Sequence, residues 1–311
     1  MNLVLLQILP FFALIGLGFY AGKIKFFSPD ATAALSKFVF YFALSALLFR
    51  FAANLSLAEI LDWSFVSAYI CGTGTVYLLA TAVALFRKAQ IQEAAIEAQT
   101  AVVGNVGFLA VPMLITLMGT SAIGPLMLIL TVDLILFGSL AVILITGSKK
   151  NYSTVGVLRN VGIGLLKNPM IVSITLGIIW SMLRIPISRP MNDFLEILGA
   201  AAIPGALFVI GASLATKSAE NLQAAGWLSF CKLILHPIAV AVFALNVFTI
   251  DSFAAGVMIT TAAMPVAGNV YMLAQHYGIA PQRVSAAILI STIFSIFTLT
   301  IILEYVLRLS R

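Results

Sequence analysis

The stretch TAAMPVAGNVYMLAQHYG, Thr261 to Gly278, decides the fold because it places Pro265, Gly268 and Asn269 inside a long apolar run. Proline removes a backbone donor and frees a carbonyl group about one helical turn earlier. Within a membrane, freed backbone groups are tolerated only where they are buried in protein or line a cavity. The stretch therefore predicts a broken helix, provided that the chain spans a membrane.

The composition of the chain predicts a membrane protein. Of its 311 residues, 62% are hydrophobic and only 9% are charged, whereas about a quarter of the residues in soluble domains are charged. Apolar runs of about 20 residues, long enough to cross a bilayer, recur from end to end. We therefore expect an all-α polytopic membrane protein with the lipid bilayer as its main partner. The net charge of +6 is explained by the lysines and arginines that membrane proteins carry in their cytoplasmic loops, so no nucleic-acid partner is expected.

The apolar runs divide into ten predicted transmembrane helices, five on each side of one 22-residue connection. The spans are residues 3–22, 31–53, 64–86, 91–118, 121–146, 169–186, 193–215, 224–248, 252–278 and 283–307. The predicted units are accordingly a first five-helix repeat (1–146), a cytoplasmic loop (147–168) that could hold a short surface helix, and a second repeat (169–311). Ser28 or Asp30 is the expected N-cap of the second span.

Positive charges predict the orientation. Ten lysines and arginines lie in the odd-numbered connections: Lys23, Lys25, Arg87, Lys88, Lys149, Lys150, Arg159, Lys167, Lys217 and Arg283. Five lie in the even-numbered connections and the C-terminus: Arg50, Arg184, Arg189, Arg308 and Arg311. The positive-inside rule puts the odd connections in the cytoplasm and both termini on the non-cytoplasmic side of the plasma (inner) membrane. No Lys or Arg precedes the first apolar run, which therefore predicts a transmembrane helix and not a cleavable signal peptide.

The two halves of the chain match at an offset of 159 residues. Pro10 meets Pro169, Gly18 meets Gly177, Leu48-Phe49 meets Leu207-Phe208, and Gly119 meets Gly278. Because each half holds five predicted helices, an odd number, the second half must enter the membrane inverted relative to the first. Inverted repeats are typical of transporters, whose binding site lies at the repeat interface near the bilayer midplane.

The counterpart of the opening stretch is VVGNVGFLAVPMLITLMG, Val102 to Gly119, in predicted helix 4. A simple proline kink would explain one such segment, but two in corresponding positions indicate a binding site built from discontinuous helices. The N-termini of the second half-helices favour an anion and the carbonyl ends of the first halves favour a cation. The candidate substrate-binding residues are Gly104, Asn105, Gly107, Pro112, Pro265, Gly268, Asn269 and Tyr271.

Several segments together resemble the auxin efflux carrier family, which includes the plant PIN carriers and many bacterial members. These segments are GNVGFLAVP, MPVAGNVYMLAQHYG, SKFVFYFALSALLF, IPGALFVIGASLA, KLILHP and ISTIFSIFTLTIIL. The resemblance covers nearly the whole chain. The short central connection is similar to that of a bacterial or short-type member. The family often has a proline where this chain has Ser45. Ser45 could add a hydroxyl group to the scaffold side of the site, or its presence in place of proline could merely straighten the helix.

The resemblance implies a fold like that of the NhaA-type antiporters and bile acid symporters, in which broken helices 4 and 9 cross. Helices 1, 2, 6 and 7 would form a scaffold, through which the protein could form a homodimer. Helices 3–5 and 8–10 would form a mobile transport domain that moves like an elevator. Family substrates are mostly small organic anions: auxin in plants, and malate or malonate in some bacterial members.

Asp133 is the one acidic residue at the centre of an apolar helix, where a carboxylate is costly and usually functional. It is a candidate for carrying a coupling proton, or for binding sodium near Asn105 and Asn269; a structural hydrogen bond to a neighbouring helix is the alternative. Lys232 is expected to extend to the cytoplasmic interface, and His236 to bond a freed carbonyl. Glu93 and Glu97 are expected to face cytoplasmic water.

The sequence contains no motif of an enzyme, a cofactor site or a metal cluster. We therefore expect a secondary transporter of small organic anions, coupled to H⁺ or Na⁺ or uncoupled. The alternative from another class is a receptor or sensor that binds a small carboxylate without transporting it. A channel is a third hypothesis.

Overall fold

The computed structural model describes residues 2–54, 62–147, 154–215 and 222–309. Within these ranges the regular structure is helical and contains no β-strand. Seven helices are long and apolar enough to cross a membrane, and the bent pair Val161–Lys167 and Pro169–Met182, at 74° to each other, could supply an eighth. The ten-helix count therefore stays a prediction. Lys149, Lys150, Lys217 and Arg311 of the charge count lie outside the described residues.

The first half of the chain folds close to the predicted boundaries. Its helices are α1 (Asn2–Lys23), α2 (Pro29–Phe38), α3 (Leu44–Ala53), α5 (Trp63–Phe86), α6 (Ile91–Val102), α7 (Val111–Met118), α8 (Ile123–Thr131) and α9 (Gly138–Gly147). Three π-helical turns interrupt these runs, η1 (Val39–Ala43), η2 (Val106–Ala110) and η4 (Val132–Phe137), and a 3₁₀ turn, η3 (Thr120–Ala122), precedes α8. Predicted helix 4 is thus divided into α6 and α7.

The second half is organised in the same way. Its helices are α10 (Thr154–Lys167), α11 (Pro169–Met182), α12 (Arg189–Ala200), α13 (Ala202–Leu214), α14 (Leu222–Phe230), α15 (His236–Val242), α16 (Ser252–Ala262), α17 (Gly268–Tyr277) and α18 (Pro281–Leu309). Two further π-helical turns, η5 (Cys231–Leu235) and η6 (Phe243–Val247), interrupt the run from α14 to α15 and beyond. Predicted helix 9 is divided into α16 and α17.

Polar side chains fix several helix starts. The Ser28 hydroxyl accepts a hydrogen bond from the Ala31 N–H at 3.1 Å, as one of the two predicted caps. Asp62 caps α5 and Asp251 caps α16 by accepting from two N–H groups each. Such caps satisfy donors that the first turn of a helix leaves unpaired.

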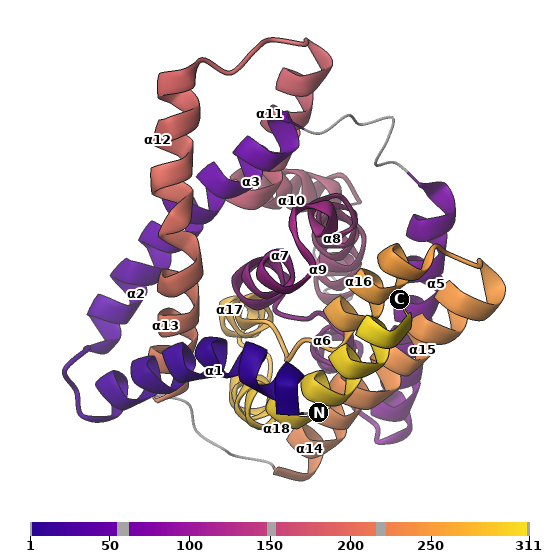
Figure 1. The fold of residues 1–311 in the computed structure, drawn as a ribbon. Coiled ribbons are helices and arrows are strands. Elements are labelled where there is room, and N and C mark those ends of the chain that lie inside the picture. The colour runs from indigo at the N-terminus through magenta and orange to yellow at the C-terminus, as the bar shows by residue number, and fades with distance from the viewer. Residues whose placement is uncertain (1, 55–61, 148–153, 216–221, 310–311) are drawn as a thin grey trace.

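The helices pack in two groups. The first contains α1, α2, α3, α11, α12 and α13, and its largest interfaces join α1 to α13 and α3 to α11. The second contains α5, α6, α8, α9, α14, α15, α16 and α18. Figure 1 shows the first group on the left and top, the second on the right, and α7 and α17 between them.

Glycines bring the helices of the first group into backbone contact. A Cβ added at Gly18 would lie 2.1 Å from the carbonyl oxygen of Phe208, and one added at Gly177 would lie 2.8 Å from that of Phe49. Small residues allow this approach in membranes, where association depends on van der Waals packing. The two contacts exchange partners between the halves: Gly18 of the first meets the second, and Gly177 of the second meets the first.

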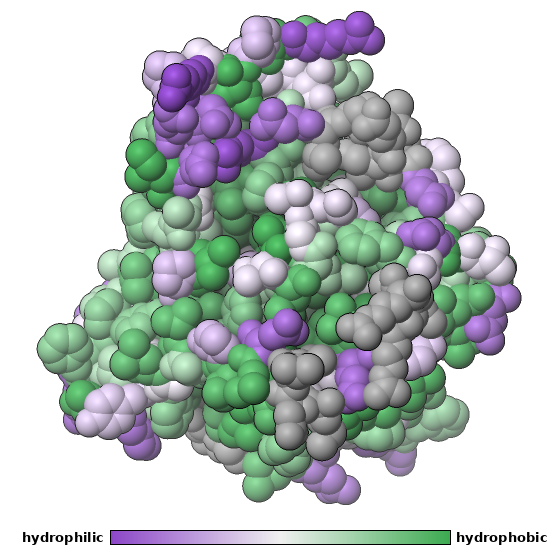
Figure 2. Space-filling view, viewed as in Figure 1, coloured by the Kyte–Doolittle hydropathy of each residue, from purple (hydrophilic) through white to green (hydrophobic). Residues whose placement is uncertain are grey.

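The outer surface suits a lipid environment. Figure 2 shows hydrophobic residues over most of the visible face, with hydrophilic residues gathered at the end where α11 and α12 meet. At that end Arg50 of α3 donates to Asn192 at 2.9 Å and to Glu196 at 2.7 Å, both on α12. The apolar belt and the polar end are those of a multi-pass membrane protein.

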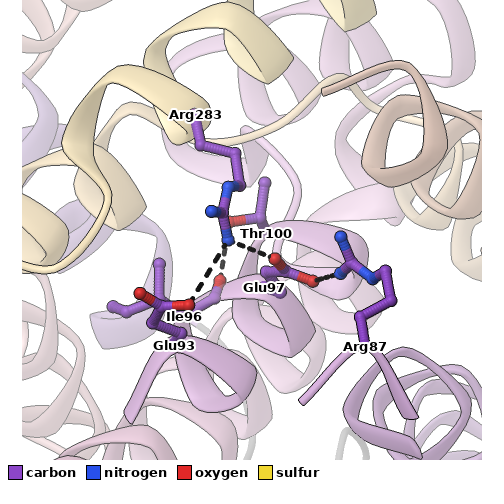
Figure 3. A network of polar contacts seen from close by, with 6 residues as sticks. All are labelled: Arg87, Glu93, Ile96, Glu97, Thr100 and Arg283. Carbon is purple, nitrogen blue, oxygen red and sulfur yellow. Dashed lines mark hydrogen bonds and ion pairs between the residues drawn. The ribbon is translucent and has the colours of Figure 1, made fainter. Parts of the chain in front are cut away.

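Glu97 of α6 is buried, with 1% of its side chain exposed, so the prediction that it faces water is wrong. It bonds Arg87, which follows α5, and Arg283 of α18, as Figure 3 shows. Glu93 keeps a 41% exposed side chain, 3.9 Å from Arg283. Two arginines from different segments converge on one carboxylate, which the sequence around Glu97 does not reveal.

Replacing Gly18 by alanine should destabilise the protein by about 1–3 kcal/mol, because the new methyl group meets a backbone carbonyl that cannot rotate away. Gly16 on the same helix has nothing within 4 Å of its added Cβ. Gly16→Ala should therefore be neutral or slightly stabilising. Thermal unfolding in detergent measures both, and equal shifts in Tm would contradict the contact.

Replacing Glu97 by glutamine should destabilise by about 3 kcal/mol, because two partly buried guanidinium groups lose their shared counter-charge. Glu93→Gln is the matched control on the same helix and should change stability by less than about 1 kcal/mol. Unfolding measured in lipid nanodiscs tests the pair. Similar small effects for both variants would show that the buried network contributes little.

Candidate functional site

Two broken helices cross and are joined by backbone hydrogen bonds. The N–H of Asn105 donates to the carbonyl of Pro265 at 2.8 Å, and the N–H of Ala267 donates to the carbonyl of Val103 at 3.1 Å. These bonds form one antiparallel bridge between Gly104 and Val266. The predicted breaks therefore exist, and each supplies hydrogen-bond partners to the other.

The breaks follow from the local sequence. Pro265 lies inside the second break and has no N–H, so only its carbonyl enters the bridge. Val266 uses its N–H to bond the Ser291 hydroxyl of α18 at 3.1 Å. Pro112 instead lies in the first turn of α7, after the π-helical turn η2, where a missing donor is tolerated. The break at residues 103–105 thus precedes Pro112 by more than one turn.

One side of the crossing is accessible. Gly268 and Asn269, at the start of α17, are exposed, and a Cβ added at Gly268 would have nothing within 4 Å. No side chain caps this helix start. Its first N–H groups and its positive dipole end are therefore available to an anion.

Asn105 differs from Asn269 in that its side chain is already engaged. It is 8% exposed, and its Oδ1 accepts from the Phe108 N–H at 3.2 Å, which caps η2. Nearby, Gly107 is closely covered: an added Cβ would lie 2.3 Å from the terminal methyl group of Met170 and 3.3 Å from Leu44. The two asparagines therefore occupy different environments, one buried and one open.

The other side of the crossing is covered by Lys232, which is completely buried. A Cβ added at Gly104 would lie 3.1 Å from its Nζ. Nζ also donates to the carbonyl of Ala262, the last residue of α16. The prediction that Lys232 extends to the interface is wrong. The Lys232 ammonium group instead lies where the first half of the broken helix, α16, exposes its carbonyl groups.

A chain of buried polar side chains starts at Lys232. Its Nζ is 3.0 Å from Nδ1 of His236, whose Nε2 is 3.0 Å from the Thr73 hydroxyl. The phenol of Tyr69 donates to Oδ1 of Asp133 at 2.8 Å, and Oδ2 has no partner among the described residues. The predicted alternative for Asp133, a bond to a neighbouring helix, is thus present. His236 bonds Lys232 and Thr73.

Both buried charges lie in π-helical turns, Asp133 in η4 and Lys232 in η5. Such turns are frequent at functional sites because they rotate side chains out of the regular helical pattern. No described ion pair joins the two residues directly, although their charges interact. The sequence signalled this cluster by Asp133 inside an apolar helix and by the one-turn spacing of Lys232 and His236, but not by Tyr69 or Thr73.

Two further candidates, Ser45 and Tyr271, have local surroundings of their own. Ser45 donates to the carbonyl of Phe40 at 3.0 Å, within its own helix, and Tyr271 is half-buried against the apolar core. A small cavity between α3, α7 and α8 is lined only by apolar residues. A charged substrate would find no polar partner there.

Comparison of the sequence with known proteins places this chain in a family. The family described as "Membrane transport protein" matches residues 3–303. A curated protein of Rhizobium meliloti (strain 1021), named "Putative malonate transporter", is 29% identical over 308 residues, which cover 97% of this chain and 95% of that protein. The apolar helices of the described residues agree with these matches. The chain therefore belongs to the membrane transport protein family, that of the auxin efflux carriers, and is a transporter and not an enzyme.

Proposed function

We propose that the protein is a secondary transporter of small organic anions that binds its substrate at the crossing of α6–α7 with α16–α17. The observation that carries this proposal is the backbone bridge between the two broken helices. The bridge leaves the start of α17 accessible at Gly268 and Asn269. Broken helices that meet in this way are the usual binding sites of transporters built from repeats.

The substrate class follows from the charges around the crossing. The start of α17 offers N–H groups, and Lys232 supplies an ammonium group behind Gly104. Both favour an anion. The similarity to a protein named as a malonate transporter supports mono- and dicarboxylates, such as malonate, malate or auxin-like acids, as substrates. The proposed substrate-binding residues are those predicted from the sequence, with Lys232 added.

The mechanism we propose is of the elevator type, in a ten-helix fold of two inverted repeats. The contacts Gly18–Phe208 and Gly177–Phe49 support the repeat. Gly177 lies 159 residues after Gly18, and Phe208 lies 159 residues after Phe49, so the two contacts are equivalent under the repeat. Gly119 and Gly278, a further matched pair, both end a second half-helix with positive φ, +84° and +70°. The division of most helices into two packed groups supports the proposed scaffold and transport domain, with α7 and α17 assigned to the latter.

For coupling we propose a proton and not sodium. A sodium ion at the end of α16 would need the carbonyl groups there, and that of Ala262 already accepts from the Lys232 ammonium group. A second positive charge there would be repelled. Asp133, bonded to Tyr69 with one oxygen, is the proposed proton carrier. Orientation with both termini outside the inner membrane, and a homodimer through the scaffold, stay predictions.

Replacing Asn105 and Asn269 by alanine, singly, should weaken malonate binding about tenfold each, the effect of losing about 1.4 kcal/mol of hydrogen bonding. Asn246→Ala, an exposed asparagine in η6, is the matched control. Binding to purified protein and uptake into proteoliposomes measure the effect. Full activity of both variants would contradict the site, and binding without any flux would favour a receptor.

Replacing Asp133 by asparagine should abolish the stimulation of malonate uptake by an imposed pH gradient, because asparagine cannot take up a proton. Asp193→Asn, an exposed aspartate of α12, should keep it. Uptake into proteoliposomes with and without the gradient, in the absence and presence of sodium, measures both. A gradient response that survives in Asp133→Asn would contradict the assignment.

A further inference from the structure

The buried polar side chains between Lys232 and Asp133 lie in two hydrogen-bonded sets that meet on α5. Lys232 reaches His236, His236 reaches Thr73, and Tyr69 reaches Asp133, at 3.0, 3.0 and 2.8 Å respectively. Thr73 lies one turn after Tyr69 on α5, so the two hydroxyl groups are on one face of the same helix. We infer that the two sets together form one path, a proton relay that connects the crossing to Asp133.

Each donor and acceptor along the path has a fitting partner. An ammonium group only donates, so Nδ1 of His236 accepts from Lys232 and Nε2 carries the proton that faces Thr73. The Thr73 hydroxyl accepts from Nε2, and its own proton is left for the phenol of Tyr69, the step that joins the two sets in the relay. The phenol in turn donates to Oδ1 of Asp133. All the donors therefore point in one direction, from Lys232 toward Asp133.

The proton transfer is balanced. Lys232 gives a proton to Nδ1 of His236, and the Nε2 proton passes to Thr73. The Thr73 hydroxyl proton passes to Tyr69, and the phenol proton passes to Asp133. Lys232 ends as a neutral amine and Asp133 as a neutral acid, while His236 changes tautomer and the two hydroxyl groups are restored.

The path is isolated from competing groups. Thr73, Lys232 and His236 are 0% exposed, Tyr69 is 1% and Asp133 is 3% exposed. The titratable groups that interact with one another here are Tyr69 from α5, Asp133 from η4, Lys232 from η5 and His236 from α15. The break after α6 and the end of α16 contribute backbone, at Gly104 and Ala262.

The relay deepens the proposed transport function and rests on it for its role. With a carboxylate bound at the crossing, attraction keeps one proton on Lys232, while Asp133 holds the coupling proton. After the substrate and the coupling proton leave, transfer of the remaining proton from Lys232 to Asp133 removes two opposite buried charges at once, and buried charges are costly. The empty carrier can then move as a neutral unit, which would complete a transport cycle.

The decisive experiment measures how fast Asp133 takes up a proton. Time-resolved infrared spectroscopy after a pH jump, on the full chain in nanodiscs, follows its carboxylic acid band, which is identified by its loss in Asp133→Asn. Thr73→Val should slow the uptake about 100-fold, the effect of removing a proton-transfer group. Thr73→Ser, which keeps the hydroxyl group, should restore the wild-type rate.

Thr75→Val is the matched control, because the Thr75 hydroxyl donates to Cys71 of its own helix at 2.8 Å. It should leave the rate unchanged, whereas Tyr69→Phe, which breaks the path at a second point, should slow it. Thermal unfolding of each variant shows that the fold is retained. A wild-type rate in Thr73→Val or in Tyr69→Phe overturns the relay.

Malonate uptake in proteoliposomes separates this inference from the proposed function. If uptake depends on the pH gradient but the infrared rate is unchanged in Thr73→Val, the relay is wrong and the transport function stands. If no carboxylate is carried but Thr73→Val slows proton uptake, the relay stands and the transport function fails. Slowing of both in Thr73→Val, with Thr75→Val unaffected, supports the two together.

Discussion

The structure depends on two backbone hydrogen bonds, Asn105 to Pro265 and Ala267 to Val103. An interrupted helix in a membrane exposes N–H and C=O groups that lipid cannot satisfy. Here the N–H and C=O groups of each break form hydrogen bonds with those of the other, so neither broken helix would be stable without its counterpart. The break in one half of the chain therefore requires the break in the other half, and the crossing is a single unit.

The charges around the crossing follow from the same constraint. Because α16 ends at Ala262, it exposes carbonyl groups there. The ammonium group of Lys232, from a third helix, donates a hydrogen bond to the carbonyl of Ala262. A buried ammonium group in turn requires an acid or polar partners within reach, which His236, Thr73, Tyr69 and Asp133 provide. The start of α17 keeps its N–H groups accessible at Gly268 and Asn269. One side of the crossing is thus internally neutralised, and the other is open to a ligand.

The sequence predicted an all-helical membrane protein and the two breaks, because proline, glycine and the lengths of apolar runs act locally, while the count of ten helices stays a prediction. It could not predict which way a polar side chain faces. Helices that are apolar on all sides have no polar face from which an orientation could be read. Lys232 and Glu97 were therefore expected near water, yet both are buried. Their partners come from segments far away in the chain, and π-helical turns such as η5 change the angles between side chains.

The glycine contacts within the first group of helices have a mechanical consequence. At Gly18 and Gly177 backbone lies directly on backbone, and no flexible side chain lies between them to absorb a shift. Where Gly107 of η2 meets the first group, the facing atoms are instead the ends of Met170 and Leu44, which can change rotamer. In the proposed elevator mechanism, rigid contacts inside one body and compliant contacts at its boundary would confine sliding to that boundary. A methionine at such a surface can change rotamer and so adapt to small shifts between the two backbones that it separates.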